Sequence, residues 1–324
     1  MNSTFQTKSC FVYAHRCAAI LCFIVTTTGC LAYNTCAEEK GAVIGNVALE
    51  LDLRESNVRK QEMPVGNMVT DAFLEEARDA IGCTALPTDV GETLDLNETG
   101  TSGSPCPVIA IQNAGGIRQE TGCGLRDTIP AGNIYAKDIE DMLPFANELW
   151  TVRLKGKDIQ LLLEHAVDAL GILGIGSEAG HFLHVAGVSY HVDCTKEPQV
   201  LSADQKQIVT QGSRVSNVLV GQGAAVTPLE EETEYEVITN AYIAGGNDGF
   251  LGFLQRDADD NVLMDAEGNA LSKATREQDL IQGNGAPLLD SEAVKDWIRA
   301  HYDQNQSVGR SPEGRITLED SCFN

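Results

Sequence analysis

Hydrophobic and polar positions change their period early in the chain. Residues 42–53, AVIGNVALELDL, alternate apolar and polar side chains, which is typical of a half-buried strand. The later segment MPVGNMVTDAFLEEARDAIG has apolar residues at helical spacing from Val69 to Ile81, and Gly82 stands where a helix stop belongs. The pattern predicts a strand followed by a helix.

Short apolar segments and turn-rich segments then alternate. Residues 83–106 are rich in Gly, Ser, Thr, Pro and Asp and predict a surface loop, whereas PVIAIQN (107–113) predicts a short buried strand. The remaining predicted elements are strands at 149–154, 183–193, 216–220 and 234–243, a helix at 157–170, and a helix with Ser291 as its cap. Because strands and helices do not alternate strictly, the sequence indicates an α+β fold.

The first 37 residues follow a different pattern. Lys8 and Arg16 precede the apolar run CAAILCFIVTTTGCLA, and no acidic residue occurs before Glu38. A positive start, a short apolar core and small residues at its end predict a secretory signal. The run is also shorter than the ~20 residues that a membrane-spanning helix needs.

This signal also contains a candidate lipidation site. TTGC resembles a bacterial lipoprotein signal in which Cys30 would carry the lipid, although Thr27 stands where a large aliphatic residue is usual. We expect residues 1–37 to be a signal peptide and residues 38–324 to form one exported domain. Its expected location is the periplasm, the outer membrane as a lipoprotein, or the extracellular space.

Charge and cysteine content restrict the partners of the exported part. Without residues 1–37, the chain has 21 Lys and Arg against 47 Asp and Glu, a net charge near −26. Such a protein repels nucleic acid polymers and anionic lipid surfaces, so a small anion can bind only at a locally positive site. The even number of later cysteines permits disulfides in an exported protein, but six cysteines allow fifteen pairings and the sequence does not choose among them. No zinc site is expected, because these cysteines have no CxxC spacing: Cys36, Cys83, Cys106, Cys123, Cys194 and Cys322.

An acidic segment near residue 260 is a candidate for calcium binding. DADDNVLMDAEGNALS (257–272) places carboxylates at alternate positions from Asp257, as a calcium loop begins. The glycine at the sixth position and the closing glutamate at the twelfth are missing. A solvated acidic hairpin is therefore the preferred interpretation.

A glycine turn after the predicted strand 107–113 presents an arginine. The sequence NAGGIR contains Asn113, Gly115, Gly116 and Arg118. Glycines let the backbone approach a ligand closely, and an arginine can bind phosphate or carboxylate through two parallel hydrogen bonds. Taken alone, a plain tight turn with a surface arginine explains the segment better.

Two aromatic residues lie near other turns. In AYIAGGNDGF, Tyr242 is predicted on a strand that ends in a glycine turn with Asp248, where a ring can stack and a carboxylate can accept sugar hydroxyls. An ordinary Asp-Gly hairpin explains the same segment. Phe145 follows a proline in MLPFANELW, and most such phenylalanines belong to the core.

Six segments together are more specific than any one of them. GNMVTDAF, NAGGIR, DIEDMLPFANELWTVRLKGKDIQLLLEHAV, AGVSYHVD, AYIAGGNDGF and GRITL, in this order, resemble the C-terminal domain of the 5′-nucleotidase and UDP-sugar hydrolase family over residues 42–318. The resemblance implies a four-layer α/β/β/α domain that binds the nucleoside part of a substrate in nucleotide catabolism. It implies that Phe145 and Tyr242 sandwich the base and that Asp248 holds the ribose hydroxyls.

The resemblance also assigns the polar turn residues. It implies that Asn113 and Arg118, on the turn with Gly115 and Gly116, form part of a nucleotide clamp, and that Arg59 points at the ribose and phosphate end. The second turn of the family commonly reads Asn-Gly-Gly-Asp-Gly, whereas this chain has Gly-Gly-Asn before its aspartate. Asparagine tolerates a positive φ, so the turn is expected to persist.

The same resemblance implies that hydrolysis in the family is carried out by a separate N-terminal metallophosphoesterase domain. That domain holds two metals through Asp-x-His, Gly-Asp, Gly-Asn-His and His-x-His motifs, and none of the six histidines here lies in one. His181 and His184 are three residues apart, but their segment offers no nearby acidic partner. We expect no cofactor in this chain, and divalent metals only in a partner catalytic domain.

Three hypotheses follow. The chain is a recognition domain that becomes catalytic with a separate metallophosphoesterase chain, or it is a stand-alone nucleotide-binding protein with no hydrolase role. The third is a gene that has lost its upstream half. A neighbouring reading frame with the metal motifs would favour the first hypothesis.

Overall fold

The structure is a computed structural model that describes residues 40–121, 124–172, 179–258, 260–274, 286–302 and 312–323. The chain divides into two units, Met1–Ala42 and Val43–Asn324, and the elements discussed below belong to the second. The predicted signal segment with Cys30 lies outside the described residues. Among the helices that are described, none has both the length and the apolar composition to cross a membrane.

A four-stranded sheet organises the second unit. Its order is β8 (Leu149–Lys155), β15 (Glu234–Asn240), β3 (Ile109–Asn113) and β9 (Leu183–Ala186). β15 and β3 are parallel, and β8 and β9 are antiparallel to their neighbours. Every residue of β3 is buried, including the amides Gln112 and Asn113 at its end, as is expected for a strand covered on both faces.

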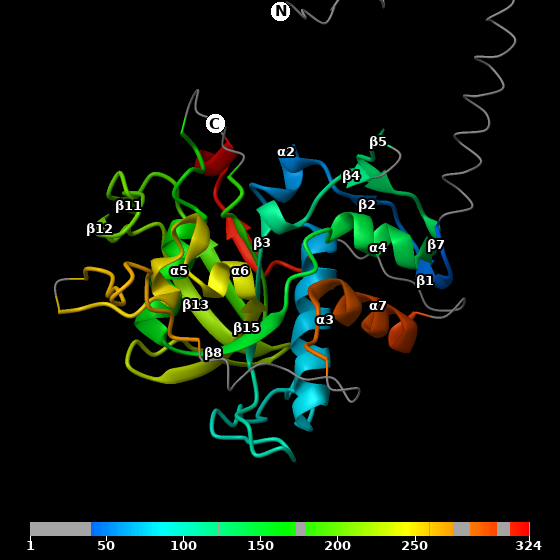
Figure 1. Cartoon of the computed structure of the whole chain (residues 1–324), viewed down its shortest axis with the longest axis horizontal. Coiled ribbons are helices and arrows are strands. Elements are labelled where there is room, and N and C mark those ends of the chain that lie inside the picture. The colour runs from blue at the N-terminus through cyan, green and yellow to red at the C-terminus, as the bar shows by residue number, and fades with distance from the viewer. Residues whose placement is uncertain are drawn as a thin grey trace, which may run out of the picture. The chain divides into compact units, whose positions relative to one another are not determined.

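Helix α3 (Pro64–Ile81) packs against β3 and β9 and also against α7 (Asp290–His301) (Figure 1). Proline suits its first turn because the missing N–H has no helical partner there. The helix ends at Gly82, whose φ of 81° lies in the left-handed region that favours glycine. The predicted helix and its stop are confirmed.

The predicted Ser291 cap of the last long helix is wrong. Helix α7 begins one residue earlier, at Asp290, and Leu289 occupies the cap position. The Asp290 carboxylate accepts the backbone N–H of Ser291 at 2.6 Å and the side-chain amide of Asn147 at 3.1 Å. The helix therefore has no side-chain cap at Leu289, and the Asp290 carboxylate accepts a backbone N–H within the first turn.

A second four-stranded sheet explains why the predicted strand 183–193 is interrupted. Its order is β14 (Ala225–Pro228), β13 (Val215–Gln222), β10 (Val188–Val192) and β16 (Ile316–Leu318). Gly187 separates β9 in one sheet from β10 in the other, with φ 69°. A Cβ there would lie 1.9 Å from the Val108 carbonyl oxygen, so only glycine allows the chain to change sheets at this point.

Short elements complete the described residues. The predicted strand 42–53 is two strands, since β1 (Val43–Val47) pairs with β7 (Gly132–Tyr135) and β2 (Leu51–Asp52) pairs with β6 (Thr128–Ile129). These short strands and the remaining helices are β1 (Val43–Val47), β2 (Leu51–Asp52), α2 (Glu55–Val58), β4 (Glu120–Thr121), β5 (Gly124–Leu125), β6 (Thr128–Ile129), β7 (Gly132–Tyr135), α4 (Ala136–Met142), α5 (Gly156–Ala166), β11 (Val200–Leu201), β12 (Ile208–Thr210), η3 (Leu251–Phe253) and η5 (Asp320–Phe323). The α+β class is confirmed.

Two disulfides connect the surface loops to this framework. Cys83 pairs with Cys106 and closes the predicted loop 83–106, and Cys194 pairs with Cys322 in η5. Such links stabilise a domain by restricting its unfolded chain. Cys36 and Cys123 lie outside the described residues.

The acidic segment 257–272 folds as the predicted hairpin. Isolated bridges pair Arg256 with Val262 and Met264 with Ala270. The Asp257 carboxylate accepts the backbone N–H of Asn261 at 3.0 Å, so its oxygens close a turn.

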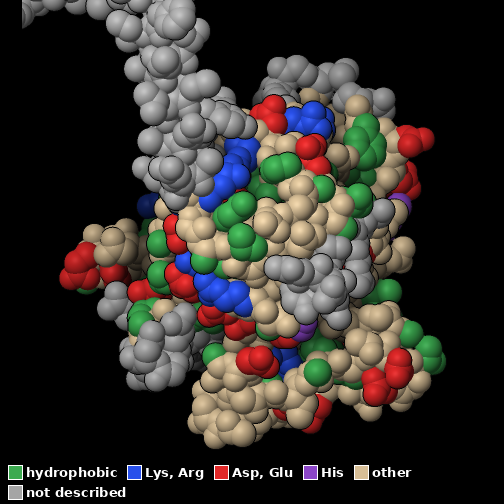
Figure 2. Space-filling view, turned by 90° about the vertical axis from the view of Figure 1, so that its right-hand side faces the viewer, with side chains coloured by type: hydrophobic (Ala, Val, Ile, Leu, Met, Phe, Trp, Pro, Cys, Tyr) green, Lys and Arg blue, Asp and Glu red, His purple; other side chains and the backbone are tan. Residues whose placement is uncertain are grey.

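Charged side chains of both signs are mixed on the face shown in Figure 2. Helices α4 and α7 are joined by such charges, because Lys295 lies 3.1 Å from Glu140 and 2.7 Å from Glu292. Carboxylates next to this lysine neutralise its charge.

Candidate functional site

Distant parts of the sequence meet at one edge of the β8–β15–β3–β9 sheet. Because β3 and β15 are parallel, the turns that follow them, η1 (Ala114–Gly116) and α6 (Ala241–Ala244), leave the sheet at the same edge. Strands β8 and β9 begin there too, since their first residues pair with the last residues of β15 and β3. We call this edge the turn edge; it comprises residues 113–118, 144–148, 179–182 and 240–250.

Buried amide side chains connect the two turns. The side-chain nitrogen of Asn240 donates to Gln112 Oε1 at 2.9 Å and to Asn113 Oδ1 at 3.1 Å. Its oxygen accepts the backbone N–H of Ile243 at 3.1 Å and so caps α6. The predicted ligand residue Asn113 is 4% exposed, and its oxygen is used within the protein. The structure therefore places Asn113 behind the turn surface, where it aligns the two turns.

The paired glycines of the first turn allow close packing. The Gly115 N–H donates to the Gly180 carbonyl at 2.8 Å, which holds η1 against the segment before β9. A Cβ on Gly116 would lie 2.2 Å from Gln112 Nε2. These glycines are thus required by the protein's own packing as well as by any close approach of a ligand.

Tyr242 lies on the short helix α6, so its prediction on a strand is wrong. The helix forms because the Asn240 side chain caps it directly after β15. The tyrosine is 44% exposed, and its hydroxyl donates to Asp248 Oδ1 at 2.8 Å. Burial of the hydroxyl, the hydrogen bond and the charge of Asp248 raise the pKa of Tyr242 to about 12, so the hydroxyl remains a donor at neutral pH.

The second turn adopts the left-handed backbone conformation at its aspartate. Asp248 has φ 56° and ψ 21°, within η2 (Asn247–Gly249). The Asn247 side chain donates to the Tyr242 carbonyl at 2.7 Å. The turn persists as expected, but the positive φ falls on Asp248 and its glycine neighbours and not on Asn247. Aspartate accepts this conformation more readily than most residues.

Phe145 and Arg118 lie beside each other at the same edge. Phe145 is 57% exposed. Its own segment, considered without the family resemblance, favours a core residue. The guanidinium carbon of Arg118 lies 5.9 Å from the centre of its ring, within the range of a cation–π contact. An aromatic ring and an arginine fork are therefore presented together.

Arg59 follows the short helix α2. Its Nη2 lies 2.5 Å from Glu55 Oε1, and its buried Nε has no hydrogen-bond partner among the described residues. The preceding carbonyl, of Val58, accepts from His184 Nε2 at 3.0 Å, and His184 pairs with Gln112 of β3. These contacts hold helix α2 near the turn edge. A role for Arg59 in ligand binding stays a prediction.

A polar cluster beneath the second turn was not found from the sequence. His165 Nδ1 lies 3.0 Å from Asp168 Oδ2, and His181 Nε2 lies 2.8 Å from Asp168 Oδ1. His165 Nε2 lies 2.7 Å from the Asp248 carbonyl oxygen. Burial alone would raise the pKa of Asp168, but the hydrogen bonds and charge of the two histidines lower it to about 2. The spacing of EHAVD offers a signal for the first contact only, since His165 and Asp168 are three apart on one helical face.

The expectation that His181 lacks an acidic partner is wrong, because Asp168 reaches it from the end of α5 across the sequence. His184, in contrast, is completely buried and donates to a backbone carbonyl. Burial lowers the pKa of His184 to about 4, so this ring is neutral at physiological pH. It is a core residue.

Among the described residues, two groups each bring three potential metal-ligand atoms within 4.8 Å of one another. In the first group, Cys83 and Cys106 form a disulfide with each other, so their sulfur atoms are not thiolate ligands for a metal beside Glu98. In the second, the two oxygens of Asp168 are each engaged by a histidine ring. Hydrogen bonds account for that cluster, so neither group is assigned to a metal.

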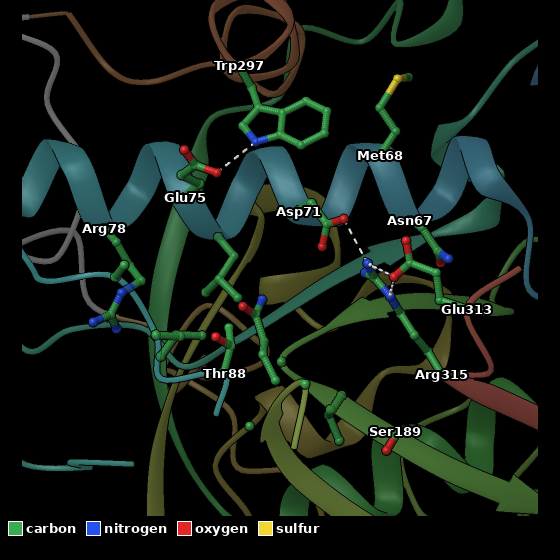
Figure 3. Close-up of a pocket in the computed structure, with 18 of the residues that line it drawn as sticks. Asn67, Met68, Asp71, Glu75, Arg78, Thr88, Ser189, Trp297, Glu313 and Arg315 are labelled. Atoms are coloured by element: carbon green, nitrogen blue, oxygen red, sulfur yellow. Dashed lines mark hydrogen bonds and ion pairs between the residues drawn. The ribbon is translucent and has the colours of Figure 1, made fainter. Parts of the chain in front are cut away.

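A large cavity lies elsewhere, beside α3 (Figure 3). Its volume is about 850 Å³, and its lining includes Gly187, at the end of β9 opposite to the turn edge. Arg315 lies 2.7 Å from both Asp71 and Glu313, and the indole of Trp297 donates to Glu75 at 2.9 Å. We call this space the α3 cavity. None of the predicted site residues lines it.

The two-sheet domain with its turn edge belongs to the α+β class that the sequence predicted, and comparison with known proteins identifies its family. The model of the 5′-nucleotidase C-terminal domain matches residues 43–255. The chain therefore belongs to the 5′-nucleotidase C-terminal domain family.

Similar proteins carry nucleotidase names. The chain is 33% identical to NAD 5′-nucleotidase of Haemophilus influenzae over 165 residues, covering 49% of this chain and 24% of that protein. It is 34% identical to a probable 5′-nucleotidase of Treponema pallidum over 185 residues, covering 55% of this chain and 27% of that protein. A 5′-nucleotidase precursor structure from Thermus thermophilus matches with a TM-score of 0.58 and 26% identity, over 92% of this chain and 43% of that one. The matched region thus spans about a quarter of these curated relatives.

Proposed function

We propose that this chain recognises a nucleotide or nucleoside at the turn edge and takes part in nucleotide catabolism, with hydrolysis only in the presence of a metallophosphoesterase partner. The observation that carries the proposal is the presence of two contacting pairs at this edge: Arg118 against the exposed ring of Phe145, and exposed Tyr242 hydrogen-bonded to the carboxylate of Asp248. A planar base, ribose hydroxyls and a phosphate are the groups that such side chains bind.

The chemistry of the turn edge supports binding and positioning. Asp248 already accepts a hydroxyl, that of Tyr242, at 2.8 Å, and a ribose hydroxyl is a donor of the same kind. Hydrolysis of a phosphate ester in this family would use two metals held by the partner domain. We propose no cofactor for this chain itself.

The alternative is a stand-alone nucleotide-binding protein. Calorimetric titration of residues 38–324 with AMP, adenosine and UDP-glucose, together with a phosphate-release assay with manganese, tests both proposals. Binding without turnover supports a recognition domain, and turnover restored by an added metallophosphoesterase chain favours the partner hypothesis over the alternative. Absence of binding to all three ligands contradicts the proposed function.

We further propose that the chain is exported after removal of residues 1–37, or anchored as a lipoprotein through Cys30. The support is the segment's sequence of two basic residues followed by an apolar run. Mass spectrometry of the mature protein distinguishes a cleaved terminus from a lipidated cysteine. An intact initial segment in the purified cellular protein contradicts export by this signal.

A further inference from the structure

His165 makes two polar contacts that a neutral histidine cannot make at once. Its Nε2 faces the Asp248 carbonyl oxygen at 2.7 Å, and its Nδ1 faces Asp168 Oδ2 at 3.0 Å. A carbonyl and a carboxylate accept hydrogen bonds and do not donate them, whereas a neutral imidazole has one N–H. Two donated bonds require a proton on each ring nitrogen.

The surroundings supply the negative charge that an imidazolium needs. The Asp168 pKa is lowered to about 2, so this carboxylate is ionised at neutral pH. The Asp168 carboxylate also bridges to His181, whose ring stacks on His165 with 4.4 Å between ring centres. The side chain of His165 is only 5% exposed.

Other charged groups near this ring are partnered with the backbone. The Arg214 guanidinium donates to the carbonyls of Val167, Asp168 and Leu170. The Glu164 carboxylate, next to His165 in sequence, accepts the backbone N–H groups of Arg214 and Val215. On the remaining side, the edge of the ring meets Phe250, which carries no charge. Asp168 is thus the carboxylate that hydrogen-bonds His165, Arg214 is the nearby cation, and His181 shares the same carboxylate.

We propose that His165 is a positioning residue of the turn edge: as an imidazolium bridging Asp168 and the Asp248 carbonyl, it holds the left-handed turn that presents the Asp248 carboxylate to the ligand. The inference rests on the proposed function, because it assigns the control of that same site. His165 lies beneath the turn and acts through Asp248.

The backbone at the turn is shaped to admit this ring. Asp248 has φ 56°, in the left-handed region that aspartate adopts more readily than most residues but less readily than glycine, so contacts of the turn help to hold it. The next residue, Gly249, has φ 83°, and a Cβ there would lie 2.8 Å from His165 Nε2. Glycine at 249 therefore permits the ring to reach the carbonyl. Through the Tyr242–Asp248 hydrogen bond, the same contact also orients the exposed tyrosine.

Protonation of His165 then controls ligand affinity. Loss of one proton leaves one of the two oxygens without a donor, and the hold on the turn weakens. We expect adenosine to bind about tenfold more weakly once the ring has lost the Nε2 proton that it donates to the Asp248 carbonyl, the effect of losing one hydrogen bond from a charged group. Adenosine is the probe because a phosphate group itself ionises near about pH 6.

Variants separate the charge from the shape of the ring. In His165→Gln, an amide nitrogen can donate to the Asp248 carbonyl without titrating, so affinity is expected to stay within about threefold of the low-pH wild type and to lose its pH dependence. His165→Phe keeps a ring without donors and is expected to bind about tenfold more weakly at every pH. His191→Gln is the matched control, since His191 is paired with Glu319 on another sheet and should keep the wild-type profile.

The measurement is calorimetry with adenosine from pH 5.5 to 8.5, with and without a chelator, on variants whose folding is checked by thermal melting. An unchanged wild-type profile in His165→Gln overturns the proposal, as does a profile that the chelator abolishes, which would indicate a bound metal. Failure of adenosine to bind at any pH contradicts the proposed function instead. In that case the ring ¹⁵N chemical shifts of His165 without ligand still decide this inference, because a neutral ring at pH 6 overturns it.

Discussion

The turn edge and the α3 cavity differ in how their polar groups are used. In the α3 cavity, Arg315 is paired with Asp71 and Glu313, so the charge of this arginine is used within the protein. At the turn edge, two aromatic rings are exposed, and the polar groups behind them serve to position the surface. The α3 cavity is therefore the weaker candidate despite its volume of about 850 Å³, because recognition depends on groups that can contact a ligand.

The largest expected effect tests the structural role of the α3 cavity. Arg315→Met leaves Asp71 without its partner and removes a hydrogen bond to the Val185 carbonyl. The free energy of unfolding is expected to fall by about 3 kcal/mol, because a partly buried carboxylate loses its ion pair and the Val185 carbonyl loses a charged donor. Urea denaturation measures the loss. Adenosine affinity of the folded variant should stay unchanged.

Arg299→Met is the control for this prediction. Arg299 and Asp296 form an exposed pair on α7, with about half of each side chain exposed, and such pairs contribute less than about 1 kcal/mol. If Arg315→Met keeps its stability but loses ligand affinity, the α3 cavity is a binding site and the comparison is reversed.

The next effect tests the turn edge itself. Tyr242→Ala removes an exposed ring, and nucleotide affinity is expected to fall by about 1–3 kcal/mol, the value of one base-stacking contact. Because the ring is 44% exposed, the free energy of unfolding should change little. Tyr242→Phe keeps the ring and loses only the bond to Asp248, so it separates stacking from positioning. Unchanged affinity of the alanine variant in calorimetry would remove Tyr242 from the site.

Much of the framework could be predicted because local signals and the final structure agree. Helix α3 ends at Gly82 as its sequence indicates, and β3 is buried along its whole length. The disulfide between Cys83 and Cys106 closes a loop whose composition already marks it as a surface segment. In each case the deciding interaction lies within one segment of the chain.

The errors arose where distant contacts decide the structure. Tyr242 leaves the strand because the Asn240 side chain caps a helical turn, and Asn240 is itself held by residues of β3. The strand 183–193 is interrupted by the approach of Gly187 to the Val108 carbonyl. Asp168 reaches His181 only in the folded chain. No periodic pattern carries such information, since each contact joins different elements.

Acid stability tests the cluster beneath the turn edge. The folded pKa of Asp168 lies below its unfolded value, so its contribution to stability is complete above about pH 4 and is lost as the pH falls to about 2. The free energy of unfolding of Asp168→Asn should therefore be about 1–2 kcal/mol lower than that of the wild type at pH 6. This difference in free energy should shrink as the pH falls from about 4 to about 2. Urea denaturation at several pH values measures it.

Glu76 on α3 provides the control of opposite sign. Burial and neighbouring carboxylates raise its pKa to about 7, so its charge destabilises the fold as the pH rises from about 4.5 to about 7. Glu76→Gln should stabilise the protein at pH 8 and have no effect at pH 4.

If the free energy of unfolding of Asp168→Asn differs from that of the wild type by the same amount from pH 6 to pH 2, the ionised bridge of Asp168 between the two histidines is contradicted.

The smallest expected effect distinguishes the parts of the ligand. Arg118 lies 5.9 Å from the centre of the Phe145 ring, so its guanidinium can reach a phosphate attached to a nucleoside that stacks there. Arg118→Ala should weaken AMP binding about tenfold and leave adenosine binding within about twofold, because only AMP carries the phosphate. Arg118→Lys keeps the charge but not the fork, and an intermediate AMP affinity is expected. Equal losses for AMP and adenosine in calorimetry would show that Arg118 acts by holding Phe145 in place, and the phosphate would then bind elsewhere on the turn edge.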